Sequence, residues 1–191
     1  MTSDRNALYQ QLLVVRSQLG DRAAMEELVG MWERRLLYYI RRLVPAEQDA
    51  LQVMQEVWVK VLSGLGRLND PARLAPWLYS LTRYTVIDHM RDSYTRRELL
   101  SKLQDQAANN AAGAETDDGI ERFDDAEQIH YGLSRVSLVD REVLTLYFLD
   151  DLSVNDVAEV LNIPPGTVKS RLYHARKALS AVLAEREGTN E

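Results

Sequence analysis

Residues 152–179 read LSVNDVAEVLNIPPGTVKSRLYHARKAL, and this stretch predicts two short helices joined by a sharp break. Ser153, followed three residues later by Asp156, is typical of a helix N-terminus because both side chains can satisfy free amides of the first turn. The run from Asn162 to Gly166 contains two prolines, which end the first helix because proline lacks the amide hydrogen that a helix needs. The pattern predicts a helix-turn-helix.

The second helix of this stretch has one apolar and one basic side. Its apolar residues follow spacings of four, three and four, the period of a helix with one buried face: Val168, Leu172, Ala175 and Leu179. At about 100° per residue, the opposite side carries polar and basic residues: Lys169, Ser170, Tyr173, His174 and Lys177. Such a helix fits the major groove of DNA, which is about 12 Å wide. An ordinary helical hairpin with a solvated basic face is the alternative.

Composition excludes several classes of protein. The 191 residues are 46% apolar and 27% charged, which is typical of a globular protein in water, and they suffice for two small domains. No apolar run approaches the roughly 18 residues of a membrane span, and the N-terminus does not resemble a secretory signal. We therefore expect a cytoplasmic protein without membrane insertion. With no cysteine and no ligand spacing among three histidines, we expect neither a metal nor a cofactor.

The net charge of −6 is unusual for a chain that binds nucleic acid, but it is unevenly distributed. Residues 103–127 hold eight acidic residues and one arginine, whereas residues 166–186 hold five basic residues and one acidic residue. The acidic segment is rich in Ala, Asn, Gly and Asp and has no sustained apolar stripe, which is typical of a flexible linker. Two roles remain open for this linker: a plain solvated tether, or a segment whose negative charge mimics nucleic acid.

Helical periodicity marks the chain before this linker as well. Leu8, Leu12 and Val15 predict a first helix, and apolar residues within 24–43 predict a second. A third helix over 49–65 has a polar side and an apolar stripe made of Val53, Met54, Val57, Trp58, Val61, Leu62 and Leu65.

A fourth helix, starting near Pro76, interleaves aromatic residues with arginines. Rings stack on unpaired bases and guanidinium groups bind phosphates, so this composition suits single-stranded nucleic acid. Trp77 suits a core equally well. For Arg83, Tyr84 and Arg91, composition alone leaves DNA binding and a structural role equally open.

Four strings resemble those of the group IV, extracytoplasmic-function (ECF) sigma factors of the sigma-70 family. They are GDRAAMEELVGMWERRLLYYIRRL, DALQVMQEVWVKVL, WLYSLTRYTVIDHMR and, after the linker, DREVLTLYFLDDLSVNDVAEVLNIPPGTVKSRLYHARKAL. Their order and spacing around an acidic linker carry the resemblance. It implies a subunit with no catalysis of its own that binds the RNA polymerase core, directs it to specific promoters and assists promoter melting.

The resemblance also implies the domain organisation. We expect an all-α chain with a region 2 domain at residues 1–97 and a region 4 domain at 127–186, which contains the helix-turn-helix. A flexible acidic linker is expected at residues 98–126, and a disordered tail at 187–191.

Site residues follow from the resemblance by position. The residues expected to contact the β′ clamp helices of the polymerase core are Asp49, Gln52, Gln55 and Glu56. The resemblance also implies a second contact with the β flap. The residues expected to bind the melted minus-ten element are Arg67, Asn69, Trp77, Arg83, Tyr84, Asp88 and Arg91. The residues expected to bind the double-stranded minus-thirty-five element are Thr167, Lys169, Ser170, Arg171, Tyr173, His174 and Lys177. An anti-sigma factor is a further partner that the resemblance allows.

Some positions depart from the family's pattern. Leu51 and Gln52 stand where acidic residues are usual, which predicts fewer polymerase contacts there. Tyr84 stands where an asparagine is common, and His174 stands where arginine is common. These two residues leave the base preference of the elements open.

Two other classes of function fit the sequence less well. One is a stand-alone helix-turn-helix regulator whose N-terminal domain senses a ligand or dimerises. Such a sensing domain would have no reason to match the family between residues 49 and 97. A helical enzyme has no support, because the chain lacks a nucleotide-binding glycine loop, a cysteine nucleophile and a paired metal-ligand motif.

Overall fold

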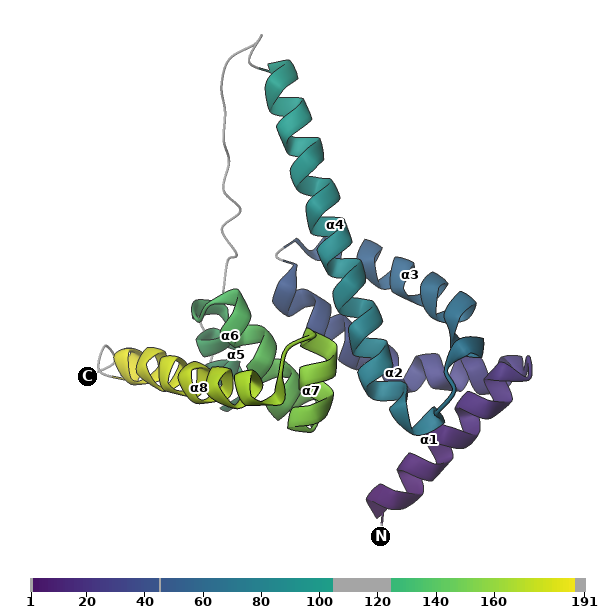
Figure 1. Cartoon of the computed structure of the whole chain (residues 1–191). Helices are drawn as coiled ribbons and strands as arrows, with labels where there is room; N and C mark the ends of the chain where they lie inside the picture. Colours follow the sequence, from purple (N-terminus) through teal and green to yellow (C-terminus); the bar gives the residue numbers. More distant parts are fainter. Residues whose placement is uncertain (1, 45, 105–124, 188–191) are drawn as a thin grey trace.

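The computed structural model describes residues 2–44, 46–104 and 125–187, and within these ranges the chain is helical with no strand. Figure 1 shows the arrangement. In chain order the elements are α1 (Thr2–Gln18), α2 (Arg22–Leu43), α3 (Glu47–Gly64), η1 (Leu65–Arg67), η2 (Pro71–Arg73), α4 (Leu74–Gln104), α5 (Asp125–Arg135), α6 (Leu138–Leu144), η3 (Thr145–Leu149), α7 (Val154–Leu161) and α8 (Pro165–Glu187). The predicted all-α class is confirmed. None of the described helices combines the length and apolar character that a membrane span needs.

Helices α1–α4 share a core in which aromatic rings join α2 to α4. Trp32 and Tyr39 of α2 both contact the ring of Tyr79 on α4 edge-to-face, at centroid distances of 6.1 and 5.3 Å. The Asp21 carboxylate caps α2 by accepting a hydrogen bond from the amide of Ala24 at 3.1 Å. These contacts fix α4, which carries most of the predicted minus-ten residues, against α2.

Helix α1 forms as predicted, but its apolar face is turned differently. The predicted stripe of Leu8, Leu12 and Val15 lies on the solvent side, while Leu13 is fully buried. On the buried side, the Gln18 amide donates hydrogen bonds to two carbonyl oxygens of the segment after α3, at 3.0 and 2.8 Å. Apart from Leu13 and Val14, the buried side of α1 consists of polar residues, so tertiary contacts and not the apolar spacing decide which side is buried.

Helices α5–α8 pack together, and their buried residues join those of α1–α4 in one hydrophobic core. Leu146, Val157 and Leu172 are among them. Gly132 of α5 faces α8, where an added Cβ would lie 2.5 Å from the side chain of Leu179. Glycine therefore allows the close approach of these two helices, which hold the helix-turn-helix in place.

The helices on either side of the predicted linker reach into it. We expected the linker at residues 98–126, but α4 continues to Gln104 and α5 begins at Asp125, so residues 98–104 and 125–126 are helical. Residues 98–104 read ELLSKLQ, which consists mostly of good helix formers that let α4 continue. Residues 105–124 and the end of the predicted tail, from residue 188, lie outside the described residues.

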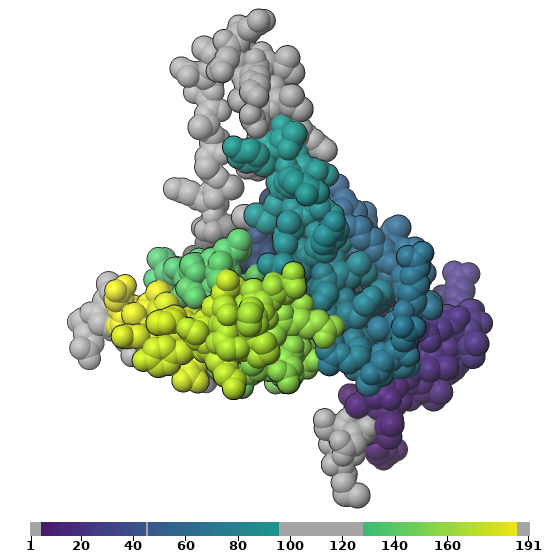
Figure 2. Space-filling model, viewed as in Figure 1, coloured from purple at the N-terminus to yellow at the C-terminus, as the bar shows by residue number. Residues whose placement is uncertain are grey.

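The two halves of the molecule are in direct contact. Helix α7 packs on α4, and α6 packs on α2. Figure 1 shows α7 beside the first part of α4, whose C-terminal part extends away from the other helices. In Figure 2 the yellow-green surface of the C-terminal half abuts the blue-green surface of α4.

Candidate nucleic-acid interface

The predicted helix-turn-helix is present as α7 and α8. The Ser153 hydroxyl accepts a hydrogen bond from the amide of Asp156 at 3.1 Å, and the Asp156 carboxylate accepts one from the amide of Ser153 at 3.2 Å. This is the predicted reciprocal cap. Helix α7 ends at Asn162, which adopts the left-handed conformation with φ of 53°, and α8 starts at Pro165. Asparagine tolerates that conformation better than most residues, so the turn is encoded locally.

Helix α8 presents the predicted basic face to solvent. Val168, Leu172 and Ala175 are buried. All seven residues predicted for the upstream element lie on α8, and five of them are exposed: Lys169, Ser170, Tyr173, His174 and Lys177. The other two, Thr167 and Arg171, are half-buried at the edges of this face. The rings of Tyr173 and His174 contact each other edge-to-face at 5.3 Å, which leaves a flat, polar and basic surface.

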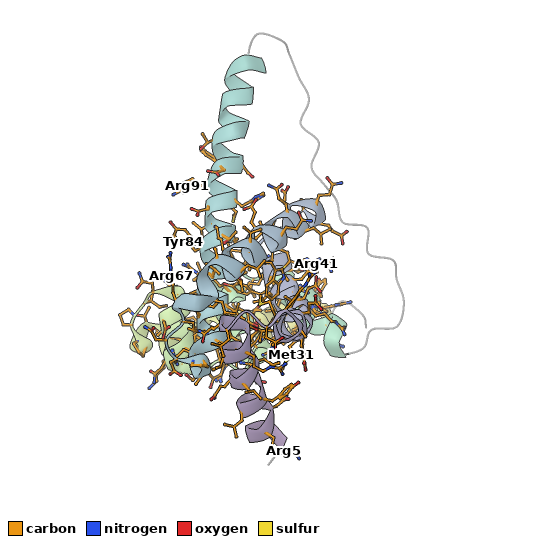
Figure 3. The ribbon with its side chains drawn as sticks, turned by 90° about the vertical axis from the view of Figure 1, so that its right-hand side faces the viewer. Arg5, Met31, Arg41, Arg67, Tyr84 and Arg91 are labelled. Atoms are coloured by element: carbon orange, nitrogen blue, oxygen red, sulfur yellow. The ribbon has the colours of Figure 1, made fainter. Side chains whose placement is uncertain are left out.

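A second exposed group follows the outer side of α4 and the loop before it. Arg67, Asn69, Tyr84 and Arg91 are all exposed. Figure 3 shows Arg67, Tyr84 and Arg91 one above another along the same side of the molecule. The Arg91 guanidinium donates to the Asp88 carboxylate at 2.7 Å, which orients both side chains. Five of the seven predicted minus-ten residues therefore belong to this surface.

The other two predicted minus-ten residues are turned inward. Trp77 is half-buried and packs against the backbone of Gly64, where an added Cβ would lie 3.2 Å from the ring. The Arg83 guanidinium donates from Nε to the Glu142 carboxylate of α6 at 2.9 Å. Neither residue is available on the outer surface in this conformation, because the first contributes to the core and the second is in an ion pair between the two halves.

Lys60 of α3 belongs to the outer surface of α4, although we did not predict it for this site. Its ammonium group donates to the Thr85 hydroxyl at 3.1 Å and lies 4.0 Å from the Asp88 carboxylate. It also lies 5.8 Å from the centroid of the Tyr84 ring. From the sequence, Lys60 is one of several polar residues on its helix, and only the packing of α3 on α4 brings it beside Tyr84.

The residues predicted to bind polymerase share helix α3. Gln52 and Gln55 are exposed, and Asp49 and Glu56 are half-buried. The Gln52 amide donates to the Glu56 carboxylate at 3.0 Å. Leu62, which the predicted buried stripe included, is instead 65% exposed. Helix α3 ends at Gly64, and its last turn is covered by neighbouring elements on the opposite side, so Leu62 faces solvent.

Two carboxylates lie between the halves of the molecule. Glu142 accepts hydrogen bonds at one oxygen from both Tyr39 and Arg83, each at 2.9 Å. Burial raises the pKa of Asp150 to about 6, against the opposing influence of Tyr79 and Arg35. Burial also raises the pKa of Tyr79. Within the described residues, no cluster of three metal-ligating side chains is present.

Comparison with known proteins decides the family. The family model for Sigma-70 region 2 matches residues 28–97, and the model for Sigma-70, region 4 matches residues 126–179. The RNA polymerase sigma-H factor of Pseudomonas aeruginosa is 30% identical over 183 residues, which cover 91% of this chain and 93% of that protein. The ECF RNA polymerase sigma-E factor of Escherichia coli K12 is 28% identical, covering 90% of this chain and 93% of that protein.

The chain belongs to the ECF sigma factors of the sigma-70 family. As a sigma factor it directs RNA polymerase to promoters. The fold of this sigma factor is similar to that of the sigma factor RpoE from Bartonella quintana, which was solved in complex with the anti-sigma factor NepR. That likeness has a TM-score of 0.64 at 19% identity and covers 84% of this chain and 96% of the other.

Proposed function

We propose that this sigma factor contacts promoter DNA with two surfaces and the polymerase core with a third. Helix α8 reads the minus-thirty-five element as duplex, the outer side of α4 holds the melted minus-ten element, and α3 docks on the β′ clamp helices. The observation that carries this proposal is that the exposed members of the three predicted groups lie on different helices: α8, α4 with the loop before it, and α3. Each surface has the chemistry that its ligand requires.

On α8, the exposed polar side chains reach base edges in the major groove. Lys169 and Ser170 lie near the start of the helix, which is the part that enters the groove in this motif. Tyr173 and His174 follow one turn later on the same face. Arg171, Thr167 and Lys177 lie beside this face and bind phosphates, which sets the position of the helix without reading sequence.

On α4, Tyr84 stacks on an unpaired base of the minus-ten strand. Its ring is 62% exposed, so stacking needs no rearrangement of the helix. Arg67 and Arg91 lie on the same side of the molecule and bind the phosphates, while Asn69 and Asp88 provide hydrogen-bonding groups near the bases. Extruding a base costs a few kcal/mol of lost stacking, and contacts of this kind offset that cost and assist melting.

On α3, Asp49, Gln52, Gln55 and Glu56 form the polymerase-binding surface. Exposed apolar residues on the same helix, including Val59 and Leu62, add area that a protein partner would cover. A second contact, of region 4 with the β flap, completes the attachment to the core. The protein acts without catalysing a reaction, in the cytoplasm, where the polymerase and the chromosome are found.

An anti-sigma factor is a further proposed partner. The similar Bartonella quintana sigma factor was solved with such a protein. The apolar surface of α3 is well placed for competition, because a protein that covers it would exclude the polymerase.

Transcription in vitro tests this function. Core polymerase from the source organism, its genomic DNA in fragments and this protein should yield transcripts with discrete 5′ ends, because the sigma factor confines initiation to its promoters. Sequencing those ends gives both elements. A reaction without the protein is the control, and the same set of 5′ ends in both reactions would contradict the proposal.

A further inference from the structure

Helix α1 has a row of apolar residues that faces solvent in the part of the chain that the structure describes. The exposed fractions are 65, 51, 41 and 83% for Leu8, Leu12, Val15 and Leu19, which we call the α1 row. The opposite side of the helix, where Leu13 is fully buried, packs on α2. Single exposed apolar residues are common on protein surfaces, whereas a continuous apolar patch marks a binding site.

The spacing of the α1 row is that of a two-stranded coiled coil. From Leu8 to Leu19 the row advances by four, three and four residues, which is the alternation of d and a positions over two heptads. A period of 3.5 residues keeps such a row on one side along the whole helix, where a second helix can cover it. Since the packing on α2 uses the other side, the α1 row fits a helix from outside the fold.

Contacts with α2 and the turn before it hold α1 in place before any partner binds. The Tyr9 hydroxyl donates to the Glu27 carboxylate of α2 at 2.7 Å, and the Arg16 guanidinium donates to the Asp21 carboxylate at 2.6 Å. An isolated helix of this length is only marginally stable in water, so a free peptide would lose much of its binding energy to ordering. Figure 1 shows the first part of α1 extending away from the other helices, and Figure 3 shows Arg5 near its free end.

The α1 row is complementary to itself when two copies of the helix meet antiparallel. Placing Leu12 of one copy opposite Val15 of the other also places Leu8 opposite Leu19. All four apolar residues of each copy then have an apolar partner in the other. The arrangement has a two-fold axis, which is the symmetry of most protein dimers.

The surface beside the α1 row has room for one of its own side chains. An open hollow of about 550 Å³ is lined by Arg5, Asn6, Leu8, Tyr9 and Leu12. In a coiled coil each apolar side chain inserts between four residues of the facing helix. The residue that meets this hollow in the antiparallel pair is Leu19 of the other copy, which is the most exposed residue of the row.

Charge at the start of α1 also favours the antiparallel pair. A parallel pair would place the Arg5 side chains of both copies side by side, where they repel each other. In the antiparallel pair each Arg5 lies near the C-terminal end of the other helix, whose free carbonyl groups carry partial negative charge.

We propose that the free chain forms a weak antiparallel dimer through Leu8, Leu12, Val15 and Leu19 of α1. The row covers about 18 Å of helix, so the contact buries less than the roughly 1,200 Å² of a standard interface, and the dimer depends on protein concentration. None of these four residues belongs to the three surfaces of the proposed function. The dimer therefore stands or falls independently of that function.

Sedimentation equilibrium of the free full-length chain measures the dimer. The unmodified protein should pass from monomer to dimer as its concentration rises from about 1 to about 500 μM. Leu12→Glu places a carboxylate opposite Val15 at two points of the symmetric contact, so the dissociation constant should rise at least about tenfold. Val139→Glu makes a similar change at a 46% exposed position on α6 and should leave the constant unchanged. Circular dichroism checks that both variants fold as the unmodified protein does.

Disulfide formation tests the orientation, because the chain has no cysteine of its own. An oxidised mixture of Leu8→Cys and Leu19→Cys should give a covalent dimer of the two variants, since these positions face each other in the antiparallel pair. Each variant alone should stay largely monomeric, because its two cysteines lie at opposite ends of the pair. A mixture of Leu19→Cys and Val139→Cys is the control for random collision.

Three results would contradict the proposal. A monomer at every concentration, or equal dissociation constants for Leu12→Glu and the unmodified protein, would overturn the dimer. Disulfide formation by Leu8→Cys alone to the same extent as in the mixture would overturn the antiparallel arrangement. A monomeric chain whose Leu12→Glu variant binds core polymerase more weakly would assign the α1 row to the polymerase in place of a second copy.

Discussion

Asp150 is a carboxyl whose environment opposes its charge. It is 5% exposed between Arg35 of α2 and Tyr79 of α4, with Asp151 beside it, and burial raises its pKa to about 6. The unfolded chain would titrate near 3.9. Because the folded pKa is the higher one, ionisation of Asp150 costs stability at every pH above about 6, and this cost disappears as the pH falls toward 4.

Asp150→Asn should therefore stabilise the protein at neutral pH. Asparagine has nearly the same shape and no charge, so the free energy of unfolding at pH 7.5 should rise by about 1–3 kcal/mol. The advantage should shrink as the pH falls from 6 to 4, where the native carboxyl is protonated. Urea unfolding at several pH values measures this. Asp151→Asn, at the exposed neighbouring position, is the control, and its difference in unfolding free energy from the unmodified protein should not change in this way with pH. The same pH dependence in both variants would contradict the prediction.

Helix α8 combines residues that we expect to read bases with residues that we expect to bind phosphates. Lys169→Ala should reduce binding to the minus-thirty-five duplex by about 1–3 kcal/mol and relax discrimination at one base pair, because it loses a base contact. Arg176→Ala removes the same charge from an exposed position outside the predicted face. It should weaken binding to all duplexes alike and lower the salt dependence. Fluorescence anisotropy with the matched duplex and with duplexes substituted at single base pairs distinguishes the two effects. If the affinities of Lys169→Ala and Arg176→Ala depend on duplex sequence in the same way, Lys169 reads no base.

Elements whose determinants are local could be predicted from the sequence. The reciprocal cap of Ser153 and Asp156, the break at Asn162 and the buried face of α8 all depend on residues within one or two turns. The exposure of Lys169 follows from the same periodicity. These features need no knowledge of the rest of the chain.

Features that depend on contacts between distant elements could not be predicted. The apolar spacing of α1 favours the side that is exposed in the structure, while Gln18 holds the other side inward through hydrogen bonds to carbonyls about fifty residues away. Arg83 could not be assigned to an ion pair from composition, because its partner Glu142 lies 59 residues later. The same holds for Lys60 and Tyr84, which only the packing of α3 on α4 brings together.

At the scale of the whole molecule, the net charge of −6 is less informative than the placement of charge. Acidic residues of α6 and α7 face arginines of η2 and α4, while the basic face of α8 stays exposed. The face of α8 that we propose for the duplex is therefore exposed, whereas Arg83, which the resemblance assigns to the minus-ten element, is paired with Glu142.

The ion pairs of Arg73 with α7 predict a gain in single-strand binding when one of them is removed. Free full-length Glu159→Lys should bind a 12-nucleotide single strand from the mapped minus-ten element about two- to fivefold more tightly than Glu33→Lys, because Arg73 loses one of its two ion pairs and is more available to phosphates. Glu33→Lys makes the same charge change at an exposed position on α2. The comparison with Glu33→Lys removes the general effect of added positive charge. Fluorescence anisotropy measures both affinities, and a strand of the same length and scrambled sequence shows how much of the gain is specific. Equal affinities of the two variants for the minus-ten strand would mean that the pairing of Arg73 with α7 does not limit binding of the strand.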